Sequence, residues 1–141
     1  MNVQKKIIAC AIPIAVLAFL CSPLPASAQG VSTERAPRVI ALDPSATEST
    51  DVFKGPPETY TMRSGYMVLA PSKSVGKHST RANEEAVIVL AGTGEMKITE
   101  GKNLRLRAYS VAYCPPFTEH DVVNTGQDTL RYIWLVAKAA K

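Results

Sequence analysis

Short apolar and alternating segments follow one another from about residue 59 to the end of the chain, with turn-forming residues between them. Continuous apolar runs suit buried strands, and strict alternation, as in LRLRA, suits a strand with one buried face. No segment in this part of the chain shows a helical period. We therefore predict seven strands, at residues 66–70, 86–91, 95–99, 104–108, 111–113, 121–124 and 130–136.

Turn signals of the hairpin type separate several of these strands. Gly92-Thr93-Gly94 follows the second segment, residues 100–103 (EGKN) follow the third, and residues 125–128 (TGQD) precede the last. Short strands at regular spacing with such turns are typical of an antiparallel sandwich or barrel. The length fits one all-β domain, for which we set the bounds at residues 59–141.

Residues 29–58 are rich in Ser, Thr, Pro and charged residues, which predicts an extended N-terminal arm. The apolar stretch at residues 39–42 (VIAL) allows one short strand at most. The arm has two placements open to it, along a sheet edge of its own domain or along a partner subunit. Pro56-Pro57 excludes a helix and marks the boundary.

Residues 1–28 have the pattern of a secretory signal peptide. Lys5 and Lys6 precede an apolar run at residues 7–20, and Ala26-Ser27-Ala28 forms a cleavage site before residue 29. The run is shorter than the ~20 residues that a spanning helix needs. A lipoprotein signal at Cys21 fits less well, because Phe19 and Leu20 precede it. We expect cleavage after Ala28 and a periplasmic or secreted protein, with no membrane partner afterwards.

Cleavage removes two of the 16 basic residues and leaves 14 against 12 acidic ones, so the net charge falls to about +2. The basic residues are interleaved with acids, which excludes a nucleic-acid surface or a polybasic membrane patch. Cleavage also removes Cys10 and Cys21 and leaves Cys114 alone, so no intramolecular disulfide forms. Cys114 is either a reactive thiol near the mouth of the barrel or an inert buried residue.

The chain has only two histidines, His78 and His120, and each lies in a turn that leads into an apolar strand. Glu85 begins another such strand. In a barrel, alternate residues of each strand point inward, so these three side chains can meet. Two imidazoles and one carboxylate suit a divalent metal and leave coordination positions open. The alternatives are ordinary loop histidines, and Glu84 in place of Glu85 after a shift of one residue.

Residues from about Tyr66 to Val136 resemble a cupin domain, a small jelly-roll barrel. The first motif of that family reads G-x5-H-x-H-x(3,4)-E-x6-G, and the second reads G-x5-P-x-G-x2-H-x3-N. The residues that match are His78, Glu85 and Gly92 in the first motif and Pro115, His120 and Asn124 in the second. The resemblance implies one antiparallel jelly-roll barrel and, from its metal sites, bound Fe, Mn, Ni or Zn at His78, Glu85 and His120.

The chain departs from both motifs. Ser72 and Tyr109 replace the two opening glycines, and Phe117 replaces the inner glycine of the second motif. Thr80 stands where the second histidine of the first motif belongs, and its hydroxyl is a weak ligand. The site is therefore either an open three-ligand centre or a relic that binds no metal. Because Phe cannot cheaply adopt glycine angles, we predict a different turn at Phe117, its ring either capping the barrel or packing on the prolines.

Aromatic and polar side chains near the motifs are the candidates for a ligand pocket. We select Thr80, Tyr66, Tyr113, Phe117 and Trp134, and assign Tyr132 mainly to the core. Arg105 and Arg107 alternate with leucines and indicate a solvated sheet face; if that face were inward, they would form an anion site.

Two classes of function follow from the resemblance. One is a metal-dependent enzyme of the dioxygenase, isomerase or lyase type that acts on a small oxygenated molecule, with a pocket tyrosine or Glu84 as proton carrier. The other is a non-catalytic module that binds a small molecule or sugar beside a decayed metal site. In both cases we expect a homodimer, since cupin sheets commonly pair to cover their edges.

Overall fold

A computed structural model describes residues 35–140, and within that range all regular secondary structure is β-strand. Each of the seven predicted strands is present, some of them longer than predicted, and two short strands are added. The strands are β1 Thr50–Phe53, β2 Arg63–Leu69, β3 His78–Ser79, β4 Asn83–Ala91, β5 Thr93–Ile98, β6 Leu104–Arg107, β7 Val111–Cys114, β8 Glu119–Val123 and β9 Leu130–Lys138. The all-β prediction is confirmed.

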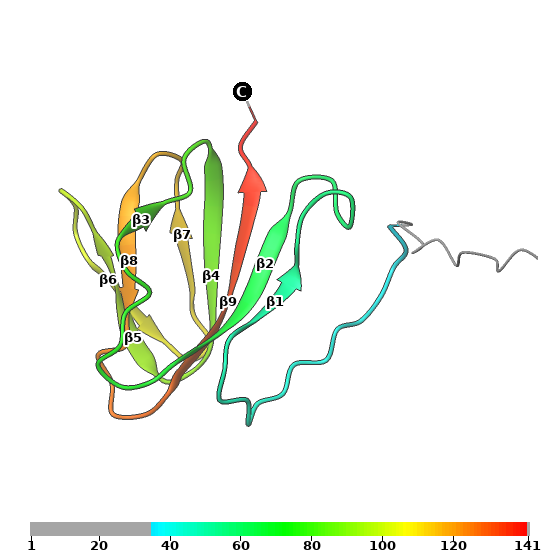
Figure 1. The fold of residues 1–141 in the computed structure, drawn as a ribbon. Coiled ribbons are helices and arrows are strands. Elements are labelled where there is room, and N and C mark those ends of the chain that lie inside the picture. The colour runs from blue at the N-terminus through cyan, green and yellow to red at the C-terminus, as the bar shows by residue number, and fades with distance from the viewer. Residues whose placement is uncertain (1–34, 141) are drawn as a thin grey trace, which may run out of the picture. The chain divides into compact units, whose positions relative to one another are not determined.

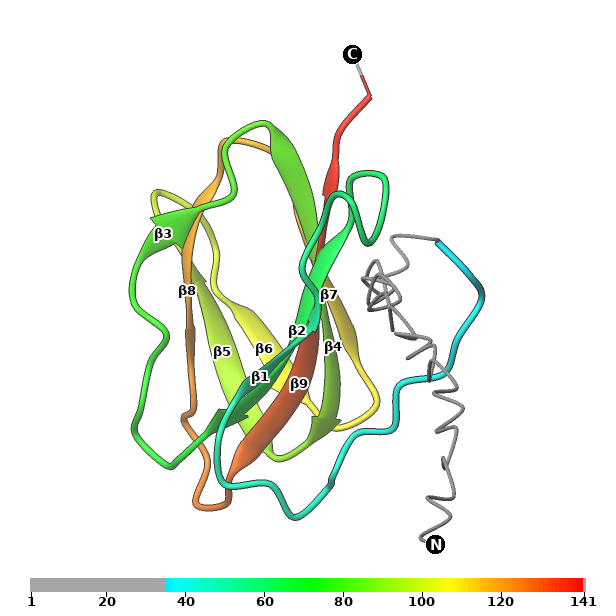
Figure 2. The same cartoon turned by 45° about the vertical axis from the view of Figure 1, so that its right-hand side comes forward.

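The strands form two antiparallel sheets that face each other (Figures 1 and 2). One sheet has the order β1-β2-β9-β4-β7, and the other has the order β3-β8-β5-β6. Strands that are distant in sequence are neighbours in both sheets, as β2 and β9 show. This long-range antiparallel order is that of a jelly-roll barrel.

Alternation along the strands decides which side chains fill the space between the sheets. In β4, Glu85, Val87 and Val89 are buried and the intervening residues are more exposed. The core combines inward-facing residues of both sheets, which are Leu69, Val87, Val89, Met96, Leu106, Ala112, Cys114, Val122, Leu130 and Tyr132. A carboxylate at the end of an apolar inward row is costly unless it has a partner.

The arm contains a strand, but not where the apolar pattern places it. Residues 39–42 form no strand, and Val39 is 95% exposed. The strand is β1, which pairs with β2 at the edge of the five-stranded sheet, with Thr50 opposite Tyr66. A strand needs a neighbouring edge whose backbone groups can hydrogen-bond with its own, and in the described part of the arm residues 50–53 lie on such an edge. Residues 50–53 of the arm thus pair with the sheet of their own domain.

Three residues that stand at glycine positions of the motifs have a left-handed backbone. Ser72, Tyr109 and Phe117 have φ values of 64°, 63° and 61°, the left-handed region that favours glycine. The prediction that Phe117 changes its turn is therefore wrong. Its backbone N–H donates to the carbonyl of Arg81. This hydrogen bond helps to hold Phe117 at a positive φ, which is unfavourable for a residue with a side chain.

The predicted signal peptide, its cleavage site after Ala28 and Cys21 lie outside the described residues. Within residues 35–140, no helix is long and apolar enough to cross a membrane.

Candidate metal centre

His78 and His120 lie directly opposite each other on the paired strands β3 and β8. Opposite residues of an antiparallel pair share a face, so both imidazoles project to the same side of the four-stranded sheet. Their ring centroids are 4.5 Å apart, with the ring planes at 55°. The cross-strand pairing explains why two histidines 42 positions apart in the sequence meet.

Glu85 approaches the histidines from the facing sheet. It lies on β4, between Cys114 of β7 and Val136 of β9. One atom from each of His78, Glu85 and His120 lies within 4.8 Å of the others. Two ligands of one zinc ion lie at most about 4.4 Å apart, twice the usual bond length. The three side chains therefore come together at a spacing close to that of ligands on one ion.

Backbone carbonyls determine which ring nitrogen each histidine presents to a metal. The Nδ1 of His78 lies 2.8 Å from the carbonyl oxygen of Gly76, and the Nδ1 of His120 lies 3.1 Å from that of Thr118. Because a carbonyl only accepts hydrogen bonds, the proton of each ring is held at Nδ1. Nε2 is then the ligating atom on both rings, and outer hydrogen bonds of this kind orient metal-binding histidines.

The pair of His120 and Glu85 is buried, with exposed fractions of 0% and 5%. The Nε2 of His120 lies 3.1 Å from a carboxylate oxygen of Glu85. This hydrogen bond, together with that to Thr118, raises the pKa of His120 against the opposing effect of burial. The position between the two side chains can hold either a shared proton or a divalent cation. The donor set therefore fits a cation, with two neutral imidazoles and one charge-balancing carboxylate.

A hydrogen-bonded loop supports His78 from outside the cavity. The carboxylate of Asp121, next to His120 on β8, accepts hydrogen bonds from the hydroxyl of Ser74 and the backbone N–H of Gly76. Gly76 in turn accepts from the ring of His78. The loop that carries His78 is thus tied to the strand that carries His120, which reduces the freedom of the more exposed ligand.

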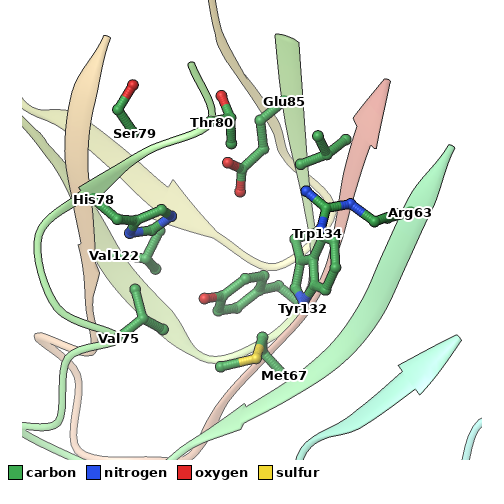
Figure 3. A pocket seen from close by; sticks show the side chains of 11 residues that line it. Arg63, Met67, Val75, His78, Ser79, Thr80, Glu85, Val122, Tyr132 and Trp134 are labelled. Atoms are coloured by element: carbon green, nitrogen blue, oxygen red, sulfur yellow. The ribbon is translucent and has the colours of Figure 1, made fainter. Parts of the chain in front are cut away.

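His78 and Glu85 line a cavity of about 290 Å³ between the sheets (Figure 3). His120 is fully buried and touches Glu85, and it is not among the residues that line the cavity. The walls of the cavity are mostly apolar, with polar groups at the end where His78 and Glu85 lie. Thr80 and Trp134, two of the five pocket candidates, line it. The lining residues are Arg63, Met67, Val75, His78, Ser79, Thr80, Glu85, Val122, Tyr132, Trp134 and Val136.

The other three candidates do not line this cavity, and strand alternation explains two of them. Tyr66 of β2 faces the arm, where its hydroxyl accepts a hydrogen bond from Arg131. Tyr113 of β7 is on the outer face and 56% exposed, while the next residue, Cys114, points inward. Phe117 is 75% exposed in its left-handed turn, so its ring does not cap the barrel.

Tyr132 and Arg63 are among the lining residues that were not selected from the sequence as pocket candidates. Tyr132 is two positions before Trp134 on β9, so alternation alone places both on one face. Its hydroxyl points into the cavity (Figure 3). Burial raises the pKa of Tyr132, which keeps the phenol neutral. Arg63 begins β2, three residues before the predicted start of that strand.

The structure separates Glu84 from the site. Glu85 is buried, whereas Glu84 faces outward and accepts a hydrogen bond from Tyr113. Glu84 therefore cannot carry protons within the cavity. The side chains of Arg105 and Arg107 are exposed on β6, as the solvated-face prediction has it, and they form no inward anion site.

Cys114 is fully buried, with its Sγ 3.1 Å from the Nδ1 of His120. Burial, followed by the charge of Glu85, raises the pKa of the thiol to about 11. A protonated, inaccessible thiol is a poor nucleophile. Of the two interpretations of Cys114, the structure favours the inert one.

Thr80 occupies the position of the missing histidine and cannot replace it. Its hydroxyl donates to the backbone carbonyl of Asn83 at 2.8 Å, and the amide of Asn83 donates back to the carbonyl of Thr80. The side chain thus closes the turn between β3 and β4. The last motif residue, Asn124, is also structural, since its buried amide donates to the carbonyls of Leu69 and Asp128.

Comparison with solved structures places this architecture among cupins. A cupin protein from Bacteroides fragilis has a TM-score of 0.63 at 17% identity, over 74% of this chain and 86% of that one. A Cupin 2 conserved barrel domain protein from Salinispora arenicola has a TM-score of 0.60 at 23% identity, over 74% and 91%. The cupin domain of Schizosaccharomyces pombe Cnp3 has a TM-score of 0.58 at 16% identity, over 64% of each chain.

At these identities, the likeness concerns the fold. No curated protein matches the chain. The family model described as "Cupin domain" matches residues 65–136, just over half of the sequence. The match spans the strands from β2 to β9 and includes all three side chains of the centre. The chain therefore belongs to the cupin family.

Proposed function

We propose that this cupin holds one divalent metal ion at His78, Glu85 and His120 and acts on a small oxygenated molecule. The observation that supports the proposal is the meeting of two imidazoles and one buried carboxylate from facing sheets, with His78 and Glu85 at the polar end of a largely apolar cavity. Three protein ligands leave positions open for a substrate.

A bound ion would supply Lewis-acid or dioxygen chemistry, which corresponds to isomerase, lyase or dioxygenase reactions. The chain itself supplies the surroundings. Met67, Val75 and Val122 make much of the cavity wall apolar. The neutral hydroxyl of Tyr132 is placed to donate a hydrogen bond to a ligand oxygen, and takes the role of the pocket tyrosine that holds a proton.

Metal content tests the proposal. The protein is reconstituted separately with Fe, Mn, Ni and Zn, desalted and analysed for elements, alongside His78→Ala/His120→Ala and Glu85→Gln. We expect about one equivalent of at least one metal in the wild type, and little in the double variant. If wild type retains no more of any metal than the double variant, the proposal fails.

A non-catalytic binding module is the second candidate function. Thr80 in place of a fourth ligand favours it, as does the outward position of Glu84, which leaves Tyr132 as the acid–base group of the cavity lining besides the proposed ligands His78 and Glu85. Incubating the loaded protein with a metabolite extract distinguishes the two. Mass spectrometry would show compounds consumed and formed by an enzyme, and compounds retained unchanged by a binding protein.

We further propose that the protein is exported and dimeric. The sequence pattern of residues 1–28 supports export. Exposed apolar side chains on the edge strand β7, Val111 and Tyr113, support a second copy of the chain as partner. N-terminal sequencing after expression in a bacterial host should begin at Gln29. Light scattering of the mature protein should give twice the chain mass, and Val111→Lys should lower it to a monomer.

A further inference from the structure

Arg63 is the one basic residue among those that line the cavity. It lies opposite Val136 in the pairing of β2 with β9, at a position whose side chain faces inward. Gly65 and Met67 follow on the same face of β2. The guanidinium group reaches past Trp134 toward Glu85 (Figure 3). A charged residue therefore occupies the outer end of an otherwise apolar inward row.

Local packing guides the side chain of Arg63 in this direction. Its methylene groups lie against Gly55, where an added Cβ would be 3.0 Å from Cγ. Gly65 leaves room for the indole of Trp134, since a Cβ there would be 2.5 Å from its Nε1. Within residues 35–140, the guanidinium forms no ion pair or side-chain hydrogen bond that would hold it elsewhere.

The charges of the cavity favour an anionic occupant. A divalent ion beside Glu85 and two neutral imidazoles leaves a charge of +1, and Arg63 adds another. Both lie at the edges of a space whose remaining walls are largely apolar. Arg63 itself is exposed to solvent at the outer end of the cavity. An anionic ligand would interact with both charges, and a neutral ligand would not; beside apolar walls this attraction is stronger than in bulk water.

We propose that Arg63 binds the carboxylate of the substrate, and that the substrate class is small carboxylates with a short apolar body and an oxygen that faces the metal. This inference rests on the proposed function. The planar fork of arginine matches a carboxylate in a bidentate manner. The cavity volume of about 290 Å³ limits the body to a small chain or a single ring.

Isothermal titration of the metal-loaded protein tests the proposal with two matched pairs of probes, lactate with lactamide and benzoate with benzamide. We expect at least one acid to bind more tightly than its amide. Arg63→Gln should weaken binding of that acid roughly ten- to a hundredfold and leave the amide within about twofold. Arg63→Lys should fall between the two, because lysine keeps the charge and loses the fork.

Arg105→Gln, which removes an exposed arginine from β6, serves as the control and should change neither probe. The proposal is overturned if neither acid binds with a dependence on Arg63, or if inorganic phosphate shows a larger dependence than both acids. The same titrations on His78→Ala/His120→Ala separate the two hypotheses. A preference for acid that depends on Arg63 and survives in this metal-free variant supports the anchor independently of the metal proposal, which is decided by the metal content of the wild type.

Discussion

At the scale of single residues, the centre depends on side chains that are oriented from behind. The Nδ1 protons of His78 and His120 are held by backbone carbonyls, and Glu85 is the inward member of a pair of adjacent glutamates. Loss of Nε2 or of the carboxylate removes a ligand, whereas loss of the supporting hydrogen bonds changes its orientation. Outer contacts of the second kind typically affect metal affinity ten- to a hundredfold.

Thr80 provides a direct test of the incomplete ligand set. Thr80→His places an imidazole at the motif position where the family has its second histidine, on the wall of the same cavity. We expect metal affinity to rise at least about tenfold, because a fourth protein ligand is added. Competition with a chelator measures the change, and Thr80→Val controls for the lost bond to Asn83. Equal affinity in the histidine variant and the wild type would contradict this placement of Thr80.

Cys114 should resist alkylation in the native state. Its side chain is fully buried and its pKa is raised to about 11, so at pH 8 the thiolate is scarce and inaccessible. With a chain that begins at Gln29, iodoacetamide should modify this thiol at least about a hundredfold more slowly than in denaturant. Mass spectrometry measures both rates. Rapid native modification would show that the cavity wall beside His120 opens to solvent.

The residue pattern predicts the ligands better than the rest of the cavity. Motif spacing identifies His78, Glu85 and His120, since each must match in both type and position. Whether a side chain such as that of Tyr132 faces the cavity depends on the alternation along its strand. An error of one position in the predicted strand exchanges the inward and outward faces. Tyr113 was selected on aromatic character and lies on the outer face. Arg63 falls outside the predicted strand at residues 66–70. The polar residue Ser64 interrupts the apolar pattern, so the sequence does not show that Arg63 continues the inward-facing residues of β2.

At the scale of elements, the turns contain backbone conformations that residue types do not predict. The left-handed residues Ser72, Tyr109 and Phe117 occupy positions where the family has glycine. Non-glycine residues prefer negative φ, but the hydrogen bonds around each turn stabilise the positive φ. Tyr109, for example, donates its backbone N–H to the carbonyl of Val89 at 2.9 Å. Strained positions of this kind cost about 1–3 kcal/mol each.

Substitutions at Tyr109 measure this strain. The ring is 95% exposed, so its removal loses little burial. We expect Tyr109→Gly to raise the free energy of unfolding by up to about 1 kcal/mol, and Tyr109→Val to lower it by about 1 kcal/mol, because β-branched residues tolerate this region least. Denaturant unfolding gives both values. The same glycine substitution at Tyr60, which is exposed and has no positive φ, should not stabilise the protein. If Tyr109→Val were more stable than Tyr109→Gly, the inferred strain at Tyr109 would be wrong.

At the scale of the whole molecule, the centre joins the two sheets. His78 and His120 belong to the four-stranded sheet and Glu85 to the five-stranded sheet. An ion held by all three is a cross-link across the barrel that the unfolded chain does not provide. Two short strands, β1 and β3, complete this architecture and were not predicted, since each is defined by the edge on which it lies rather than by its own pattern.

Metal should therefore stabilise the fold. At a metal concentration of a hundred times Kd, linkage predicts about 2.7 kcal/mol, and the Tm of a domain of this size should rise by roughly 10 °C or more. Thermal denaturation with and without the metal selected by elemental analysis measures the shift. His78→Ala/His120→Ala should show little change. An equal shift in the double variant would locate the stabilising ion elsewhere on the protein.

The central claim, that these three side chains form one metal site, is tested most directly by anomalous diffraction from crystals of the metal-loaded protein. We predict that the strongest anomalous peak lies between the two sheets, about 2.0–2.2 Å from Nε2 of His78, Nε2 of His120 and a carboxylate oxygen of Glu85. A peak coordinated by other residues, or none at this position in protein that retains one equivalent of metal, would contradict the account.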